Sequence, residues 1–317
     1  MRKILVTGVS GFVSQYLLKY LSSLDGIYEI YGITRNRIDF PEYKNLQIKL
    51  FDADLQNSLL LRDIIESVQP DTIIHLASDS SVAYSWQKPI ESFQNNTNIF
   101  LHLVEAVRLL NVKCRILSIG SSEEYGVVTQ DALPLTESSP LNPVSPYAVA
   151  RVSQEMLSSV YANGYGLDIV MTRSFNHIGS GQREAFVISS FAKQIIELKL
   201  GKRASIEVGN VDIVRDFLDV TDVVKAYICL LEKGKKGEVY NVCSGKGYSL
   251  KELIEIMMKL AGVNSGYNIN AKLIRPSDNP IIIGSNKKIK EECNWQPEIA
   301  IEESLSKMLD HWAEKLK

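Results

Sequence analysis

The strongest constraint on the fold is a short apolar run that ends in a glycine turn near the beginning of the chain. Residues 4–6 are Ile, Leu and Val, an apolar run of the kind buried in a parallel strand, and it stops at Thr7 and Gly8. Beyond the turn, Val13, Leu17 and Leu21 recur at helical spacing. The segment therefore predicts a strand, a glycine turn and a helix, which is the opening unit of an α/β fold.

The two glycines of this turn suit an anion. Gly8 can take a backbone angle closed to other residues, and Gly11 has no side chain to keep a diphosphate away from the amides that open the helix. With Ser14 they form the spacing Gly-x-x-Gly-x-x-Ser, a short form of the dinucleotide-binding turn. An ordinary turn between strand and helix is the alternative, but the place of this turn at the head of an α/β pattern favours a cofactor site.

The second predicted strand, residues 28–34, indicates which dinucleotide is bound. It ends in Thr34 and Arg35. An acidic residue near this point would bond the ribose hydroxyls of NAD, whereas an arginine suits the 2′-phosphate of NADP. Arg35 therefore favours NADPH, with NADH possible, and a solvated surface arginine is the alternative.

Length and charge limit the other classes of function. A chain of 317 residues can bury a substantial core, and its net charge of −2 provides no basic field for nucleic acid and no polybasic membrane patch. There is neither an apolar run of about 18 residues nor a secretory signal, so we expect a cytoplasmic protein with a small partner. The cysteines form no C-x-x-C pair and the histidines are scattered, so we expect reduced cysteines and no metal site.

Strands and helices alternate over the first 178 residues and then lose this alternation. Further strands are predicted at residues 46–50, 72–77, 114–119 and 167–171, and helices at 98–110 and 145–161. The pattern predicts a Rossmann-type doubly wound parallel sheet, with residues 1–178 mainly a dinucleotide-binding domain. Residues 179–317, including a strand at 239–242, read as a smaller α/β lobe for the substrate, with some segments crossing between the lobes.

Two stretches place reactive side chains at the end of the predicted sheet. Ser121 and Ser122 follow the fifth strand, at its carboxyl end. Tyr147 and Arg151 lie four residues apart and therefore share one face of a predicted helix. A nearby positive charge stabilises a phenolate, so this tyrosine could pass a proton to or from a substrate oxygen. An aromatic ring that simply packs on an arginine is the alternative.

Together these features resemble the extended short-chain dehydrogenase/reductase family that acts on nucleotide sugars, over essentially the whole chain. The runs that look most like GDP-4-keto-6-deoxy-mannose reductases are residues 119–126 (IGSSEEYG), 145–149 (SPYAV), 172–179 (TRSFNHIG), 209–217 (GNVDIVRDF) and 275–277 (RPS). The resemblance implies that NADPH delivers a hydride to the C4 ketone of a GDP-linked 4-keto-6-deoxy hexose. The product would be a GDP-6-deoxy-hexose such as GDP-D-rhamnose.

The resemblance also implies roles for individual residues. Tyr147 would protonate the developing alkoxide, Ser121 would hydrogen-bond the carbonyl oxygen, and Arg151 would supply the positive charge. On the cofactor side it implies Gly8, Ser10, Gly11, Phe12, Val13, Thr34, Arg35, Asp54, Leu55, Leu76, Ala77 and Ser78. On the substrate side it implies Ser122, Asn176, Lys193, Arg215, Arg275, Ser277 and Asp278.

The chain departs from the family pattern at two positions. Arg151 stands where the family has a lysine, and Ser14 stands where it usually has a third glycine. An arginine keeps the charge but is larger and planar, so it is not equivalent to lysine. A serine adds a Cβ to a closely packed turn.

Three alternatives to the reductase remain open. GDP-mannose 4,6-dehydratases of the same family need a carboxylate to remove the C5 proton, and Glu123 stands where that base would be. A GDP-linked 6-deoxy-heptose could replace the hexose. The departures at Arg151 and Ser14 also allow a non-catalytic nucleotide-sugar-binding homologue, because a fold does not by itself confer activity.

The helix predicted at residues 98–110 indicates a homodimer. Ile99 and Leu103 line one side of it, and Phe100 and Val104 line another. A helix that is apolar on more than one face needs cover on more than one face, and a second copy of the chain could provide it. The resemblance implies that this helix and the helix of Tyr147 pair with their counterparts across a two-fold axis. Burial against the sheet and helices of the same chain is the alternative.

Overall fold

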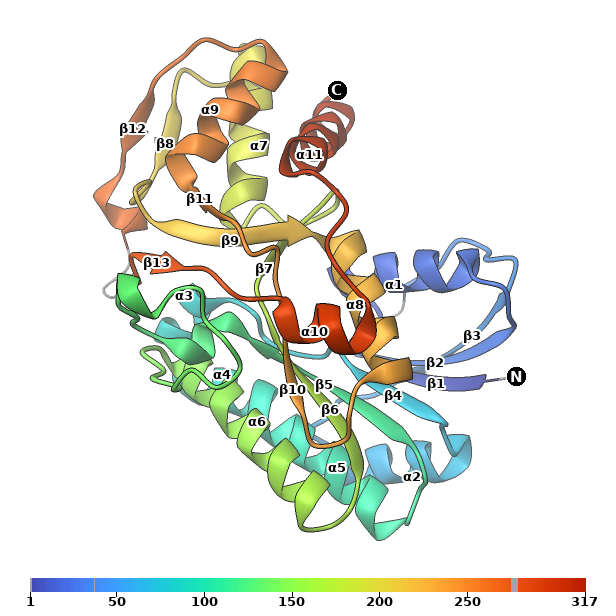
Figure 1. Cartoon of the computed structure of the whole chain (residues 1–317). Helices are drawn as coiled ribbons and strands as arrows, with labels where there is room; N and C mark the ends of the chain where they lie inside the picture. Colours follow the sequence, from blue (N-terminus) through green and yellow to red (C-terminus); the bar gives the residue numbers. More distant parts are fainter. Residues whose placement is uncertain (1, 37, 275–278) are drawn as a thin grey trace.

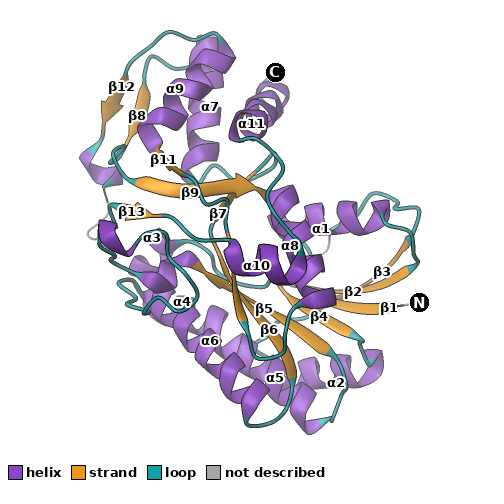
Figure 2. Cartoon of the chain, in the orientation of Figure 1, coloured by secondary structure: helices purple, strands orange, loops and turns teal. Residues whose placement is uncertain are grey.

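The computed structural model describes residues 2–36, 38–274 and 279–317. A large parallel sheet lies between layers of helices, and a smaller α/β part sits against one end of it, at the top of Figure 1. Figure 2 shows the same arrangement, with the orange strands of the large sheet running between purple helices. The predicted α/β, Rossmann-type fold is confirmed.

The large sheet has seven parallel strands among the described residues. They are β1 (Arg2–Thr7), β2 (Tyr28–Thr34), β3 (Leu46–Asp52), β4 (Thr72–His75), β5 (Arg115–Ser121), β6 (Asp168–Ser174) and β10 (Val239–Val242). Their order across the sheet is β10-β6-β5-β4-β1-β2-β3, so the chain leaves β1 in one direction and returns to its other side at β4. Ligands of such sheets bind at this reversal, outside the carboxyl ends of the strands.

Helices bury an apolar layer on each face of this sheet. α1 (Phe12–Ser23) and α8 (Val220–Lys233) pack together on one face. The other face is covered by α2 (Ser58–Val68), α5 (Ile99–Leu109) and α6 (Pro146–Asn163). In β1, Ile4 and Val6 belong to the first layer and Leu5 to the second, as the alternation of side chains along a strand requires.

The smaller part is organised around a central strand, β9 (Val214–Asp219). It pairs with β7 (Asn176–Ile178), β11 (Gly247–Ser249) and β13 (Ile281–Ile282). The remaining elements of this part are β8 (Ile206–Val208), β12 (Tyr267–Ile269), α7 (Val187–Lys199), α9 (Leu250–Ala261) and α11 (Ile301–Lys315). The three helices pack on one another around a third apolar cluster.

Two strands cross between the parts. β10 lies in the large sheet, parallel to β6, so the prediction that residues 239–242 belong to the second lobe is wrong. β7 precedes residue 179 yet pairs with β9 in the smaller sheet. A strand of three or four residues is too short for its sequence pattern to differ between the two sheets, so only its pairing partner decides its place. The boundary at residue 178 stays a prediction.

Local sequence explains where the elements near the sheet edge begin and end. Ser145 caps α6 by accepting a hydrogen bond from the N–H of Ala148 at 3.1 Å, and Pro146 takes the first helical position. β4 ends at His75, two residues before the predicted end, because the N–H of Ala77 turns to the hydroxyl of Thr7 at 3.2 Å. Short helical segments complete the chain: α3 (Val82–Gln87), α4 (Pro89–Phe93), η1 (Gln94–Asn98), η2 (Ser122–Tyr125), η3 (Gln130–Ala132), η4 (Ala271–Leu273) and α10 (Lys287–Cys293).

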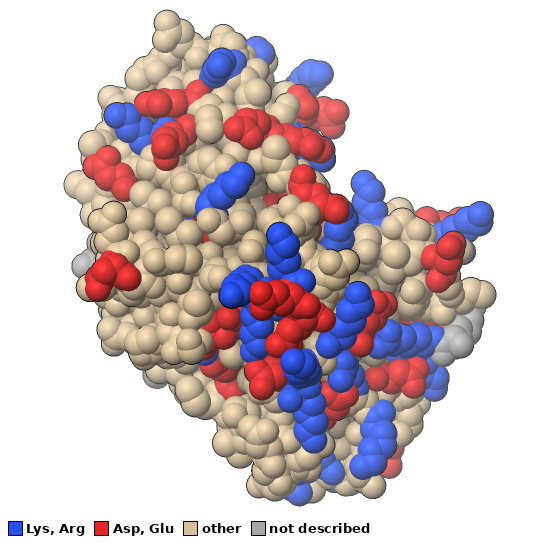
Figure 3. All heavy atoms as spheres, viewed as in Figure 1, with Lys and Arg blue, Asp and Glu red and all other residues tan. Residues whose placement is uncertain are grey.

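The surface carries charges of both signs. On the face in Figure 3, lysines and arginines are interspersed with acidic side chains. Lys288 and Glu238 form one such ion pair, at 2.7 Å. In the part of the chain that the structure describes, no helix is long and apolar enough to cross a membrane. All four cysteines are free, which confirms the expected thiols.

Candidate active site

The glycine turn after β1 lies directly against the segment that follows β4. Gly8 has a φ of +68°, and a Cβ on it would come within 2.8 Å of the backbone of Ala77. Leu76 and Ala77 pack on the two apolar layers of the sheet, and Ser78 is exposed. The structure thus brings together the residues that were predicted from two separate motifs.

Ser14 is accommodated in this turn by a hydrogen bond. The side chain is fully buried, and its Oγ donates to the carbonyl of Gly8 at 3.0 Å. The N–H of Gly11 donates to the same carbonyl at 2.9 Å. A serine in place of the third glycine therefore adds a bond that holds the turn rather than disrupting it.

A second bond ties the turn to the end of β2. The hydroxyl of Thr34 donates to the carbonyl of Asn36 at 2.9 Å and lies 3.0 Å from the Oγ of Ser10, whose hydroxyl can donate to it. Arg35 follows with an exposed side chain. An anion at this edge would therefore meet an exposed guanidinium on a fixed backbone.

Asp54 and Leu55 lie beyond the end of β3. Asp54 is exposed and its Oδ1 accepts the N–H of Gln56 at 2.9 Å, whereas Leu55 is buried. The carbonyl of Leu55 lies 3.1 Å from Nδ1 of His102 on α5. These contacts fix the loop whose residues Asp54 and Leu55 were expected on the cofactor side.

The first residues of α1 connect this region to the smaller part. The ring of Phe12 stacks on the ring of His177 in β7, with centroids 6.3 Å apart and planes 6° from parallel. Val13 packs on the first apolar layer. The hydroxyl of Tyr16 donates to the carbonyl of Ser180 at 2.7 Å, and burial raises the pKa of Tyr16 to about 12.

Tyr147 and Arg151 share one face of α6, as their spacing predicts. Both side chains are buried, and the guanidinium carbon lies 5.2 Å from the centre of the phenol ring. Nη1 of Arg151 donates to the carbonyl of Ile119 in β5 at 3.0 Å. This bond anchors α6 two residues before the carboxyl end of β5, where Ser121 lies.

Gln154 holds the guanidinium of Arg151, and our sequence analysis missed it. Oε1 of Gln154 accepts from Nη1 of Arg151 at 2.7 Å, while its Nε2 donates to Ser118 Oγ at 3.0 Å and to the Ile119 carbonyl at 3.1 Å. Ser158 donates to the same serine at 2.9 Å. The spacing of residues 151, 154 and 158 along one helix face was the available signal.

His75 is a second buried polar group that the sequence analysis did not single out. Its Nδ1 lies 2.9 Å from the hydroxyl of Thr7. Burial, and then the charge of Arg151, lowers the pKa of His75 to about 3, so the imidazole is neutral at physiological pH. Among the described residues, neither Nε2 of His75 nor Nε of Arg151 has a hydrogen-bond partner.

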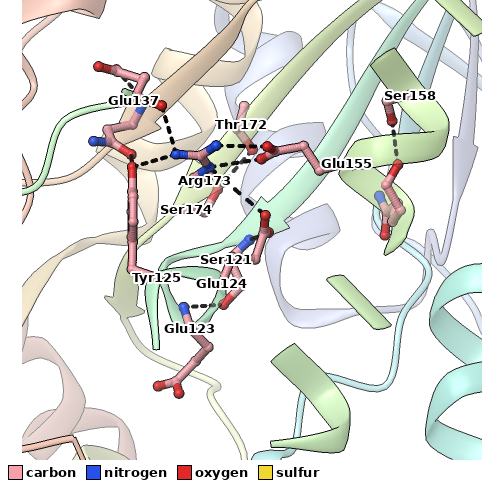
Figure 4. Close-up of polar contacts among 12 residues, drawn as sticks. Ser121, Glu123, Glu124, Tyr125, Glu137, Glu155, Ser158, Thr172, Arg173 and Ser174 are labelled. Atoms are coloured by element: carbon pink, nitrogen blue, oxygen red, sulfur yellow. Dashed lines mark hydrogen bonds and ion pairs between the residues drawn. The ribbon is translucent and has the colours of Figure 1, made fainter. Parts of the chain in front are cut away.

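Ser121 ends β5 and caps the single helical turn η2, which presents Ser122 and Glu123. The hydroxyl of Ser121 accepts the N–H of Glu123 at 3.2 Å, and Ser122 is buried. Figure 4 shows that the Glu123 side chain points away from Arg173 and from the polar residues that contact this arginine. The turn and α6 are in contact, so Tyr147 and the serines come from neighbouring elements.

Comparison with known proteins decides the family. The family profile described as GDP-mannose 4,6 dehydratase matches residues 5–308. The GDP-6-deoxy-D-mannose reductase of Pseudomonas aeruginosa is 34% identical over 317 residues, which covers 100% of this chain and 99% of the relative. The chain belongs to the GDP-mannose 4,6-dehydratase family. The family membership expected from the motifs is thereby confirmed.

Two further relatives fit the same family. The GDP-mannose 4,6-dehydratase of Yersinia enterocolitica is 28% identical, with 98% of this chain and 93% of the relative covered. The solved structure of RMD from Pseudomonas aeruginosa complexed with NADPH has a TM-score of 0.87 at 34% identity, covering 99% of this chain and 100% of that chain.

The residues that the resemblance assigns to the substrate lie mostly in the smaller part of the structure. Arg215 of β9 is buried, with Nη1 donating to the Val214 carbonyl at 3.0 Å, and Asn176 lies on the neighbouring strand β7. Lys193 of α7 is engaged by the carboxylate of Glu184 and lies 3.6 Å from that of Glu197. Arg275, Ser277 and Asp278 lie outside the described residues.

The side chains predicted at 98–110 to face a second copy are covered within this chain, whereas the dimer itself stays a prediction. Ile99, Phe100, Leu103 and Val104 are buried within this chain, so the helix at 98–110 is covered by its own neighbours. Exposed apolar side chains occur instead on α4 and on the outer face of α6, at Ile90, Phe93, Val149, Met156 and Val160. Part of this surface is a groove of about 800 Å³ between α4 and the start of α6.

Proposed function

We propose that this protein is an NADPH-dependent reductase that converts the C4 ketone of a GDP-linked 4-keto-6-deoxy hexose into an alcohol. The product would be a GDP-6-deoxy-hexose such as GDP-D-rhamnose. The observation that carries the proposal is full-length similarity at 34% identity to a GDP-6-deoxy-D-mannose reductase, against 28% to a dehydratase. The buried pair of Tyr147 and Arg151 beside Ser121 supplies the groups that such a reduction needs.

The residues around the glycine turn fit a dinucleotide. At Gly11 a Cβ would meet only the carbonyl of Gly8, at 3.1 Å, so the glycine leaves the start of α1 open, and the buried Nε of Arg151 lacks a partner among the described residues. Gly11 and Ser10 would hold the diphosphate, and Arg35 would hold the 2′-phosphate. NADPH, when bound, supplies a hydride.

Tyr147 and Ser121 would handle the oxygen of the ketone. As the carbonyl carbon gains a hydride, its oxygen gains negative charge, and the phenol gives that oxygen a proton to form the alcohol. The hydroxyl of Ser121 donates a hydrogen bond to the same oxygen. Arg151 stabilises the phenolate that Tyr147 becomes until solvent returns the proton.

Binding of the GDP-sugar would use Ser122, Asn176 and the guanidinium of Arg215, because guanidinium groups match phosphate geometry. Lys193 would take part only after exchanging Glu184 for a phosphate, since a carboxylate engages its ammonium. A GDP-linked heptose is an alternative to the hexose, and a comparison of the two substrates would separate them.

The deciding assay mixes the purified protein with NADPH and the GDP-4-keto-6-deoxy hexose and follows the loss of NADPH absorbance. Oxidation with a GDP-6-deoxy-hexose as product supports the reductase. Failure to oxidise NADPH with either keto-sugar, in protein that still binds NADPH, would favour a non-catalytic homologue.

A GDP-mannose 4,6-dehydratase is the second candidate, because Glu123 provides a carboxylate in the same turn as Ser121. Such an enzyme recycles its own hydride. Turnover of GDP-mannose without added cofactor would therefore support it, and Glu123→Gln would abolish that turnover.

We further propose a homodimer formed through the exposed faces of α4 and α6. Val149, Met156 and Val160 recur at seven and four residues, so they form one apolar stripe beside the groove at α4. A contiguous apolar surface of this kind marks an interface. Location in the cytoplasm stays a prediction.

A further inference from the structure

A fully buried carboxyl lies directly behind the turn that carries Ser121. Oε1 of Glu124 accepts the backbone N–H of Ser121 at 2.6 Å. Gly120 makes room for this contact, because a Cβ there would lie 2.4 Å from the same oxygen. Figure 4 shows Glu124 folded back in this way beside Arg173. The side chain thus holds the first residue of the turn in place.

The other oxygen of Glu124 faces no donor. Oε2 has no hydrogen-bond partner among the described residues, and Nε of Arg173 is 4.0 Å away. Every nitrogen of that guanidinium donates elsewhere. Nε and Nη2 donate to Glu155 at 2.8 and 2.7 Å, and Nη1 donates to the Tyr125 hydroxyl at 3.0 Å.

We propose that Glu124 keeps its proton at neutral pH, donates it to Glu155, and thereby acts as a positioning residue for the turn that carries Ser121 and Glu123. The charges support this assignment: one guanidinium balances one carboxylate, and a second carboxylate would leave a net negative charge in the interior. Two such carboxyl groups share a single proton.

The surroundings of Glu124 act in the same direction. Burial, followed by the charge of Glu155 on α6, raises the pKa of Glu124 well above its ordinary value, against the opposing effects of the Ser121 N–H and of Arg173 on β6. Arg173 also donates from Nη1 to the hydroxyl of Tyr125, whose pKa is raised by burial, and to the backbone carbonyl of Glu137 at 3.0 Å. The carboxylate of Glu137 in turn accepts the N–H of Asn241 at 2.8 Å. A neutral Glu124 carboxyl can accept the Ser121 N–H and donate to Glu155.

The proposal predicts a specific dependence of stability on pH. A folded-state pKa above the unfolded value means that the folded protein binds more protons between these two values, so stability falls as pH rises through that range. Glu124→Gln keeps an oxygen for the Ser121 N–H and an N–H for Glu155, and it has no proton to lose. The variant should therefore resist alkaline pH better than the wild type.

Thermal unfolding and infrared spectroscopy test the proton without any assay of activity. Between about pH 6 and pH 9, the unfolding midpoint of Glu124→Gln should fall less than that of the wild type, by on the order of 2–4 °C. Glu66 is exposed, so Glu66→Gln serves as control and should follow the wild type.

The infrared spectrum tests the proton directly: at about pH 8 the protonated-carboxyl band of the wild type should be lost in Glu124→Gln. Asp216, whose pKa burial raises to about 6, is ionised by then. Equal midpoint slopes, or no such band, would overturn the proposal.

The positioning role rests on the proposed reductase function, whereas the location of the proton does not. Glu124→Leu removes the acceptor for the Ser121 N–H, so kcat should fall about tenfold at every pH with the KM for NADPH unchanged. Glu124→Gln should extend the kcat profile toward alkaline pH. An unchanged kcat in a folded Glu124→Leu would refute the positioning role of Glu124. An inactive wild type would refute the proposed reductase function, and the unfolding and infrared results would still show whether Glu124 is protonated.

Discussion

The phenol of Tyr147 is the proton donor of the proposed reaction, and its loss can be tested without disturbing the fold. Tyr147→Phe removes a single oxygen from a buried ring that packs under the guanidinium of Arg151. We expect nearly unchanged folding and NADPH affinity with turnover lowered about 10²–10⁴-fold, the range for general acid–base groups. Steady-state NADPH oxidation measures this, and full turnover in the variant would show that another group is the acid.

Gln154 offers a second test at the level of single residues. Gln154→Leu removes one of the two acceptors of Arg151 Nη1 and leaves the Ile119 carbonyl as the other, so kcat should fall about tenfold, equivalent to about 1.4 kcal/mol. Arg151→Lys replaces the guanidinium and restores the family's residue, so by itself it should keep or raise activity. If Gln154 acts through the guanidinium, Gln154→Leu should cost less in the Arg151→Lys background than in the wild type, and an equal cost in both would mean that Gln154 does not act through Arg151.

We predict that Arg35 determines the preference for NADPH. Arg35→Ala should weaken NADPH binding much more than NADH binding, because only NADPH carries the 2′-phosphate. Titration of both cofactors measures the ratio of their affinities. Arg62→Ala, an exposed arginine on α2, is the control for net charge. Equal weakening of both cofactors would remove Arg35 from the phosphate site.

At the scale of elements, the turn between β1 and α1 requires Gly8 both for its positive φ and for its lack of a side chain. A matched pair of variants can separate these two requirements. Gly8 and Gly201 both have positive φ, at +68° and +71°. A Cβ at Gly8 would meet backbone atoms at 2.8 Å, whereas a Cβ at Gly201 would meet nothing within 4 Å. Gly201→Ala should lower the unfolding midpoint through backbone strain alone. Gly8→Ala should lower it further and weaken NADPH binding. Equal midpoint losses would mean that the turn tolerates a side chain.

The sequence predicted local features of the elements correctly, but it did not predict contacts between segments that are far apart along the chain. The pair of Tyr147 and Arg151 is local, so its spacing sufficed, and β2 was predicted with the bounds that the structure has. Gln154 was missed because its partners in β5 lie 35 and 36 positions away along the chain. The sheet to which β10 belongs was predicted wrongly for the same reason, because the sequence pattern of a strand does not show which strand it pairs with.

For the whole molecule, the exposed stripe on α6 predicts a dimer. Val160→Glu should convert a dimer to a monomer in light scattering at micromolar concentration, because it places a charge in the apolar contact. Leu260→Glu is the matched control, since Leu260 is similarly exposed on α9, away from the stripe. A monomeric wild type, or a dimer that survives Val160→Glu, would contradict the proposed interface.

The place of β10 at the edge of the large sheet has a consequence for how the chain matures on the ribosome. Until residues 239–242 emerge, the outer edge of β6 has no partner strand, and the Tyr125 hydroxyl lacks the Asn241 side chain that accepts from it at 2.7 Å. An open strand edge invites pairing with other chains. A fragment of residues 1–178 would therefore lack one strand of its own sheet. A chimeric protein that takes over the cofactor site must also include residues 239–242.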